Sequence, residues 1–311
     1  MNSCVITGAT GVIGMALIKK AIEEKTRVIV LANPDSKRLE RIPVSDYVTV
    51  IPCGIAEYGD FDADRLLKEL HIDRVDVFYH LSWAGTFGQA RNDMELQDKN
   101  VEYTLDAVRL AGRLNCECFV GVGSQAEYGR VEGALRADTP THPENGYGIK
   151  KLEAGIRSRQ LAGRLGIRHI WTRVLSIYGP YDGTGTMVMS TIDNLVNGIE
   201  PSLTKGEQLW DYLYSADAAD ALYRIGLYGV DGRIYPIGSG KARPLREYIE
   251  EIAGIVNPGV TLGFGRRPYA DNQVMYLKAD ISQLKEDTGF EANTEFTDGI
   301  REILSVHYGI E

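Results

Sequence analysis

The chain has 311 residues, enough for two domains or one large domain with an appendage, and its 43 acidic and 34 basic side chains give a net charge of −9. Hydrophobic residues make up 44% and charged residues 25%, which excludes a disordered or low-complexity protein, and the negative charge disfavours nucleic acids and anionic membranes as partners. The 4 scattered cysteines exclude a disulfide scaffold, and without a signal peptide or a membrane-length apolar run we expect a cytoplasmic protein.

Short apolar runs alternate with helical patterns through the first half of the chain. Strands are expected at 3–7, 27–32, 47–51, 75–80, 117–123 and 167–175, and helices at 12–24, 60–71, 90–115 and 146–166. The strands are continuous runs of Val, Ile and Phe, which is typical of strands covered on both faces. Strand–helix–strand repetition predicts an α/β fold with a doubly wound parallel sheet of the Rossmann type.

Beyond about residue 178 the pattern changes, because glycine and proline cluster and the apolar runs shorten. Helices are expected at 186–197, 215–228, 244–256 and 296–307, and short strands at 208–214, 233–237 and 274–278. We therefore predict a Rossmann domain at 1–178, with about 205–232 returning to it. A smaller mixed substrate-binding lobe is expected at 179–204 and 233–311.

A glycine-rich segment joins the first expected strand to the first expected helix. Its sequence, Thr7-Gly8-Ala9-Thr10-Gly11-Val12-Ile13-Gly14, has the spacing G-x-x-G-x-x-G. One glycine permits a tight turn, another lets the backbone approach a pyrophosphate, and the last lets helix and strand pack closely. The helix N-terminus adds free N–H groups for the phosphates. The segment predicts a dinucleotide site with contacts from Thr7, Gly8, Thr10, Gly11, Val12, Ile13 and Gly14.

The end of the second expected strand bears on the choice between NAD and NADP. An acidic residue there would bind the ribose 2′-hydroxyl of NAD and repel a 2′-phosphate. Asn33 stands near this position, and Ser36, Lys37 and Arg38 follow it with groups that can contact a 2′-phosphate. We expect these four residues to bind the cofactor and NADP to be preferred, although Asp35 leaves NAD open.

Tyr147 and Lys151 lie four residues apart at the start of an expected helix and so share one face. Ser124 lies at the end of the preceding strand, at the edge where parallel sheets present ligands, and Asn100 lies in the helix before that strand. We expect Tyr147 to exchange a proton with a sugar or alcohol hydroxyl and Ser124 to hydrogen-bond the same oxygen. Lys151 would hold the nicotinamide ribose and lower the pKa of Tyr147. One ammonium about 4 Å away supplies about the 4 kcal/mol needed to move a tyrosine pKa from about 10 to about 7.

With these motifs the sequence resembles the extended short-chain dehydrogenase/reductases, the NAD(P)-dependent epimerase/dehydratase group that acts on nucleotide sugars. The matching segments span nearly the whole chain: Thr7–Gly14, His80-Leu81-Ser82-Trp83-Ala84, Asn100-Val101, Gly123-Ser124, Tyr128-Gly129, Tyr147 with Lys151, Arg173–Pro180 and Trp210–Tyr214. The resemblance implies that Ser124, Tyr147 and Lys151 are catalytic with support from Asn100, and that the protein is a homodimer.

The resemblance also implies further contacts with cofactor and substrate. Cofactor contacts are expected from His80, Leu81, Ser82, Val174, Tyr147 and Lys151, in addition to the residues above. Substrate contacts are expected from Trp83, Ser124, Gln125, Ser176, Tyr178, Trp210 and Arg267. Aromatic rings there could stack on a sugar or base, and Arg267 could pair with a diphosphate. No cluster of metal ligands is expected.

Departures from the family pattern narrow the expected activity. The family's 4,6-dehydratases carry an Asp-Glu pair where this chain has Gln125-Ala126, and neither of these side chains exchanges a proton at neutral pH. Glu127 follows, but we expect it to point elsewhere, and so we expect no 4,6-dehydratase. Ser176 and Trp210 replace the family's usual Asn and Arg, as in the subgroup that reduces 4-keto-6-deoxy sugars.

We therefore expect an NADPH-dependent 4-ketoreductase of a nucleotide-activated deoxysugar. In this reaction a hydride passes from the nicotinamide to the sugar C4 carbonyl, and Tyr147 donates the proton. The alternative is a nucleotide-sugar 4-epimerase, which uses the same residues but needs tightly bound NAD because it oxidises and re-reduces one bound substrate.

Overall fold

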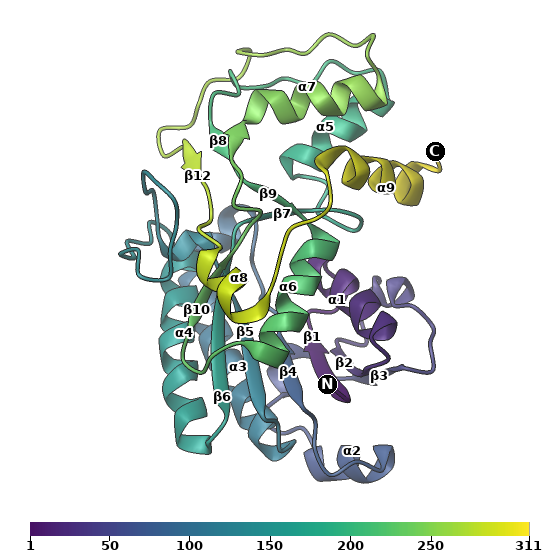
Figure 1. Cartoon of the computed structure of the whole chain (residues 1–311), viewed down its shortest axis with the longest axis vertical. Helices are drawn as coiled ribbons and strands as arrows, with labels where there is room; N and C mark the ends of the chain where they lie inside the picture. The colour runs from purple at the N-terminus through teal and green to yellow at the C-terminus, as the bar shows by residue number, and fades with distance from the viewer. Residues whose placement is uncertain (311) are drawn as a thin grey trace.

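A seven-stranded parallel sheet forms the centre of the computed structural model, which describes residues 1–310 (Figure 1). The strand order is β10-β6-β5-β4-β1-β2-β3. The strands are β1 Ser3–Thr7, β2 Arg27–Ala32, β3 Val48–Pro52, β4 Val77–His80, β5 Cys118–Ser124, β6 Arg168–Val174 and β10 Ile234–Ile237. The chain order reverses between β1 and β4, the position at which open α/β sheets bind ligands. The predicted Rossmann-type sheet is confirmed.

The smaller lobe lies beyond one end of this sheet (Figure 1). Since β6 continues directly into β7 of the lobe, this is the end at which the parallel strands finish. The lobe contains helices α5 Met187–Val196, α7 Leu245–Val256 and α9 Phe296–Tyr308. A two-stranded sheet pairs β7 Ser176–Tyr178 with β9 Tyr212–Tyr214, and a three-stranded sheet joins β11 Arg243–Pro244, β8 Leu209–Trp210 and β12 Tyr276–Leu277.

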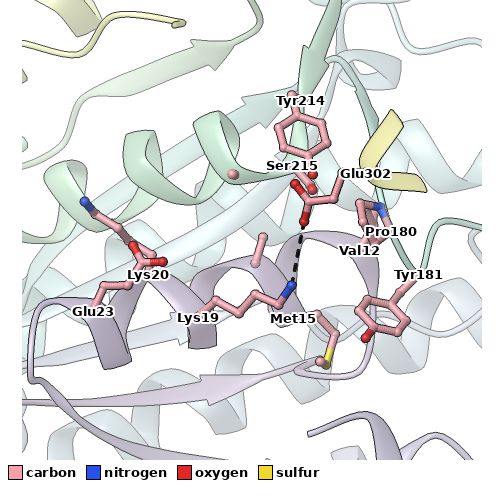
Figure 2. Close-up of a pocket in the computed structure, with 12 residues that line it drawn as sticks. Val12, Met15, Lys19, Lys20, Glu23, Pro180, Tyr181, Tyr214, Ser215 and Glu302 are labelled. Carbon is pink, nitrogen blue, oxygen red and sulfur yellow. Dashed lines mark ion pairs between the residues drawn. The ribbon is translucent and has the colours of Figure 1, made fainter. Parts of the chain in front are cut away.

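A hollow of about 260 Å³ marks the seam between the sheet domain and the lobe (Figure 2). Helix α1 Val12–Glu23 contributes Met15 and Lys19, and the lobe contributes Tyr214 and Glu302. Lys19 Nζ lies 3.9 Å from a Glu302 carboxylate oxygen across the hollow. Both side chains are about half exposed, so this ion pair contributes little to stability.

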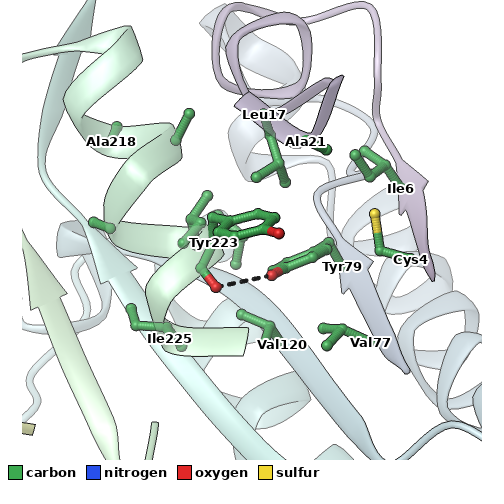
Figure 3. Packing of buried hydrophobic residues seen from close by; sticks show 14 of the residues in the cluster. Cys4, Ile6, Leu17, Ala21, Val77, Tyr79, Val120, Ala218, Tyr223 and Ile225 are labelled. Carbon is green, nitrogen blue, oxygen red and sulfur yellow. Dashed lines mark hydrogen bonds between the residues drawn. The ribbon is translucent and has the colours of Figure 1, made fainter. Parts of the chain in front are cut away.

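Helices cover both faces of the seven-stranded sheet, and successive strand residues point to opposite faces. Ile6 and Val30 pack with α1 and α6 Ser215–Tyr228, and in this cluster the Tyr79 hydroxyl donates to the Tyr223 carbonyl at 3.4 Å (Figure 3). Val5 and Ile29 pack on the other face with α2 Ala63–Leu70 and α3 Met94–Arg113. Helix α4 Gly146–Leu165 lies beside α3. Each buried aliphatic side chain contributes about 1.5–3 kcal/mol.

The structure differs from the sequence expectations in the last third of the chain. The strand at 233–237, which we assigned to the lobe, is the edge strand β10 of the main sheet. The strand expected at 208–214 is divided at Asp211, which is fully buried. Its carboxylate accepts hydrogen bonds from the backbone N–H groups of Ser239, Gly240 and Ala279, at 2.7–3.0 Å. Asp211 therefore joins segments of the lobe instead of continuing one strand.

Further short elements complete the described chain. Helix α8 Ser282–Thr288, which the sequence analysis did not predict, packs against α6 and β10. Single 3-10 turns occur at η1 Leu39–Arg41, η2 Ile55–Glu57, η3 Gly88–Asn92 and η4 Gln125–Glu127. Within residues 1–310 no helix combines the length and apolar character needed to cross a membrane.

Candidate active site

The turn between β1 and α1 has the shape that a phosphate cradle requires. Gly8 adopts a φ of +67°, and a Cβ there would lie 2.7 Å from the carbonyl carbon of Leu81. A Cβ on Gly14 would lie 2.5 Å from the Gly8 carbonyl oxygen, so helix and strand pack too closely for a larger residue. Gly11 begins the helix without a side-chain cap, which leaves its first N–H groups available to phosphate. These residues fit a dinucleotide pyrophosphate.

A cleft of about 560 Å³ extends from this turn along the ends of β1, β2 and β4. The predicted residues that line it are Gly8, Thr10, Gly11, Val12, Asn33, Ser36, Arg38, Leu81 and Ser82, together with Trp83, which we expected to bind substrate. Thr7, Ile13, Gly14, Lys37, His80, Tyr147, Lys151 and Val174 are not among the lining residues. Val174 is buried and lies opposite Ser124 in the pairing of β5 with β6.

Among the parts of the cleft wall that sequence reasoning missed are Arg41 and the loop 181–184. Arg41 lies one turn beyond the predicted basic segment and places its guanidinium 5.4 Å from the centre of the Tyr181 ring. Tyr181 belongs to the loop 181–184, which follows β7 and also lines the cleft. The nearness of Arg41 to Ser36 and Arg38 in the sequence is a signal for the first omission. No local signal shows that the loop 181–184 returns to the cofactor cleft.

His80 acts behind the cleft wall and not as part of its lining. The Thr104 hydroxyl donates to the Asn100 carbonyl, so it accepts from His80 Nε2, at 3.3 Å. His80 Nδ1 then accepts from the Thr7 hydroxyl at 3.0 Å, while Thr7 Oγ1 accepts the backbone N–H groups of residues 81–82. Burial lowers the pKa of His80 to about 3, so the ring is neutral. The expected cofactor contact is thus corrected to a positioning role.

Two amide side chains of α3 hold the loop that follows β4. Asn100 accepts the N–H of Ala84 and donates to its carbonyl, both at 2.9 Å. Gln97 donates to two further loop carbonyls and accepts the Trp83 indole N–H at 2.8 Å. Asn100 therefore holds the backbone of the loop that carries Trp83, and its expected support of catalysis stays a prediction.

Ser124, Tyr147 and Lys151 come together where β5 ends and α4 begins. Asn145 caps α4, which fixes Tyr147 in the first helical turn and Lys151 one turn later. Burial raises the pKa of Tyr147, whereas hydrogen bonding to Ser124 and the positive charge of Arg91 lower it. Burial has the largest effect, so the pKa of Tyr147 is raised overall. A buried tyrosine with a raised pKa keeps its proton at neutral pH and is suited to donate it.

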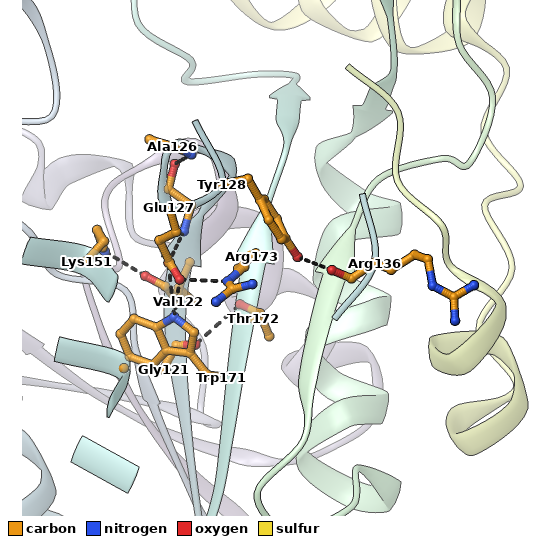
Figure 4. Close-up of polar contacts among 12 residues, drawn as sticks. Gly121, Val122, Ala126, Glu127, Tyr128, Arg136, Lys151, Trp171, Thr172 and Arg173 are labelled. Carbon is orange, nitrogen blue, oxygen red and sulfur yellow. Dashed lines mark hydrogen bonds and ion pairs between the residues drawn. The ribbon is translucent and has the colours of Figure 1, made fainter. Parts of the chain in front are cut away.

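Lys151 has a different environment from the one we expected. Its ammonium donates to the Val122 carbonyl at 2.6 Å (Figure 4). It also lies 4.0 Å from the centre of a Trp83 ring. Burial lowers the pKa of Lys151 to about 7. The expectation that Lys151 lowers the pKa of Tyr147 is corrected, because this ammonium is 5.9 Å from the Tyr147 ring centre and is directed at other partners.

Glu127 fixes the backbone of Ser124 from behind the site and lies beside Trp171 and Arg173 (Figure 4). Its carboxylate accepts the Ser124 N–H at 2.8 Å, the Trp171 indole N–H at 3.0 Å and the Arg173 Nε–H at 2.7 Å. Burial raises the pKa of Glu127, and the charge of Arg173 opposes the rise. A Cβ at Gly123 would collide with Glu127 and Trp171, so this strand position requires glycine. Sequence reasoning placed Glu127 outside the reaction but missed its positioning role.

The expected substrate residues have different surroundings. The Trp210 indole N–H donates to Ser176 Oγ at 2.8 Å, so the two positions that depart from the family pattern contact each other. Gln125 is partly buried in the turn η4, and Arg267 is exposed without an ion pair within residues 1–310. Tyr178 is corrected to a structural residue, because it is buried in the lobe core and its hydroxyl donates to the Phe296 carbonyl.

Several curated relatives match almost the whole chain. The UDP-glucose 4-epimerase of Azospirillum brasilense is 24% identical over 331 aligned positions, covering 98% of this chain and 92% of the relative. The dTDP-glucose 4,6-dehydratase of Haemophilus influenzae is 23% identical, and the alignment covers 98% of this chain and 97% of the relative. The second match corrects our exclusion of 4,6-dehydratases, because several relatives have that activity in their names.

Solved structures share this fold at low identity. The UDP-N-acetylglucosamine 4-epimerase of Methanobrevibacter ruminantium M1 aligns with a TM-score of 0.84 and 19% identity over 98% of both chains. The protein RMD of Pseudomonas aeruginosa, solved with NADPH, aligns with a TM-score of 0.77 and 20% identity over 98% of this chain and 99% of that one.

The sequence pattern of the NAD dependent epimerase/dehydratase family matches residues 4–238, which include the glycine-rich turn, Ser124, Tyr147 and Lys151. The parallel sheet and the cleft along its strand ends agree with this match. The chain therefore belongs to the NAD dependent epimerase/dehydratase family.

Proposed function

We propose that the protein is an NADP-dependent 4-ketoreductase acting on a nucleotide-activated 4-keto deoxysugar. The observation that carries the proposal is the charge of the cofactor cleft at the end of β2. Ser36, Arg38 and Arg41 line this end. Among the described lining residues, Asp182 is the one carboxylate, and it belongs to the loop 181–184 instead of β2. Its side chain accepts a hydrogen bond from the Thr186 hydroxyl. A 2′-phosphate would meet two guanidinium groups and no acidic residue from β2.

The surroundings of Tyr147 support reduction. The turn from Gly8 to Val12 would hold the pyrophosphate, and a bound nicotinamide would supply the hydride. Tyr147 retains its proton because burial raises its pKa, and it can release this proton to the sugar oxygen as negative charge develops there. Ser124, held by Glu127, donates a hydrogen bond at the same place. Trp83 lines the cofactor cleft, and the Lys151 ammonium lies behind it, 4.0 Å from the centre of its ring.

A nucleotide-sugar 4-epimerase is the second candidate. The relatives and solved structures described above include 4-epimerases that match over nearly the whole chain. An epimerase oxidises and re-reduces a bound sugar, so it needs a cofactor that stays bound through the cycle.

Cofactor content and preference test the proposal. We would denature the purified protein to identify any released nucleotide, and then titrate apo-protein with NADPH and NADH by fluorescence. Arg38→Gln is expected to weaken NADPH binding by about tenfold to a hundredfold, since a hydrogen bond to a charged group contributes about 1.5–3 kcal/mol, and to leave NADH binding unchanged. Lys37→Gln is the matched control, because Lys37 does not line the cleft. Tightly retained NAD, or equal losses in both variants, would overturn the proposal and favour the epimerase.

A further inference from the structure

Arg91 places a second cation beside the tyrosine that we propose as proton donor. Its guanidinium carbon lies 4.4 Å from the centre of the Tyr147 ring, closer than the ammonium of Lys151 at 5.9 Å. Arg91 is partly buried and donates to the Thr86 carbonyl at 3.2 Å. Within residues 1–310 no carboxylate lies within ion-pair distance of it. Its charge is therefore not neutralised by a neighbouring acid.

The segment that carries Arg91 is tied to the helix that carries Tyr147. Asn92 Oδ1 accepts the N–H of Gly146, the first residue of α4, at 3.0 Å. A Cβ at Gly146 would lie 3.0 Å from the Arg91 carbonyl oxygen, so the two backbones meet closely. Gln97 donates to the Ala90 carbonyl at 2.8 Å and holds the segment from its other side. Hydrogen bonds on both sides of Arg91 therefore hold its segment in place beside Tyr147.

Lys151 and Arg91 differ in whether they stay charged near neutral pH. Burial lowers the pKa of Lys151 to about 7, so near neutral pH a substantial share of its side chains is uncharged. A guanidinium remains protonated throughout this range. A cation over an aromatic face is attracted to the ring, and the attraction grows when the ring carries the negative charge of a phenolate.

We propose that Arg91 is a positioning residue for proton transfer: it holds the Tyr147 ring and stabilises the phenolate that forms when the proton leaves. This inference rests on the proposed role of Tyr147 and adds a residue that neither the sequence analysis nor the family resemblance assigned. Trp83 contacts Tyr147 edge-on at 6.0 Å between ring centres, so the ring is packed by an indole and a guanidinium.

A titration of Tyr147 tests the proposal without a substrate. We would record the ultraviolet absorbance of tyrosinate across a pH series for the protein and for its Tyr147→Phe variant. The difference between the two curves is the titration of Tyr147. Arg91→Gln is expected to raise the pKa of Tyr147 by about 1 unit or more, because the phenolate loses an opposite charge that lies within about 4–6 Å of the ring. Arg91→Lys should retain part of the effect, because it keeps the charge but loses the planar contact. The control is Arg109→Gln on α3, where the arginine pairs with Asp106.

The outcomes separate the inference from the proposed function. An unchanged Tyr147 titration in Arg91→Gln, or an equal change in Arg109→Gln, would overturn the role of Arg91. Absence of NADPH-dependent turnover of a nucleotide-activated 4-keto-6-deoxyhexose by the parent protein would instead overturn the proposed function, and full turnover by Tyr147→Phe would overturn the role of Tyr147 as proton donor. Asn92→Ala provides a second test if Arg91→Gln does not fold. It removes the hydrogen bond to Gly146 that holds the Arg91 segment against α4, so it should also raise the pKa of Tyr147. An unchanged titration in Asn92→Ala would count against the inference.

Discussion

The replacement of Gly14 by alanine probes the phosphate cradle most directly. The new Cβ would lie 2.5 Å from the Gly8 carbonyl oxygen and 2.7 Å from Cα of Ala9, and both are backbone atoms that cannot rotate away. Overpacking of this kind costs about 1–3 kcal/mol, whereas the gain in helix propensity is about 0.8–1 kcal/mol. The net expectation is destabilisation of up to about 2 kcal/mol.

The same displacement should weaken cofactor binding. Gly8 and Ala9 both line the cleft, so a shift of their backbone moves the phosphate-binding N–H groups. We expect a loss of about tenfold or more in NADPH affinity, corresponding to about 1.4 kcal/mol or more. Fluorescence titration gives the affinity, and thermal denaturation gives the stability.

Gly163→Ala is the matched control. Gly163 also lies in a helix, α4, but a Cβ there would meet nothing within 4 Å. Only the helix-propensity gain remains, so this variant should be as stable as the parent or up to about 1 kcal/mol more stable, with unchanged NADPH affinity. If Gly14→Ala behaved like Gly163→Ala in both assays, the close packing of β1 and α1 would not be the reason for glycine at this position.

Three further variants test the site. Arg173→Leu should destabilise the protein by about 3–5 kcal/mol in urea denaturation, because it leaves the Glu127 carboxylate buried without its partner, and adding Glu127→Leu should recover part of the loss. Lys151→Met should abolish turnover but raise the melting temperature, more at about pH 6 than at about pH 9. Burial lowers the pKa of Lys151 from 10.5 to about 7, so the unfolded chain binds the extra proton between these values and the penalty on folding disappears as pH rises; an equal gain at both pH values would contradict this reasoning. Asn100→Ala should weaken NADPH binding several-fold by releasing Ala84, and an unchanged affinity would show that the loop holds itself.

Features of this protein that depend on neighbouring residues can be predicted from the sequence alone. Continuous apolar strands alternating with helices predict the parallel sheet, because each pattern reports which faces of its own element are buried. The turn from Gly8 to Gly14 is recognisable for the same reason, since its glycines serve a local bend and a helix start. Tyr147 and Lys151 share a helix face through their spacing alone.

Tertiary structure decided which charges and side chains meet. Arg91, Glu127 and Arg41 contact groups that the fold brings close, and their positions in the sequence do not show these contacts. The partners of Lys151 and the burial of Tyr178 likewise depend on segments far away in the chain. A pKa responds to desolvation and to charges a few ångströms away, and folding sets both. Tyr147 could therefore be predicted from the sequence as a proton donor, but the groups that surround its side chain could not.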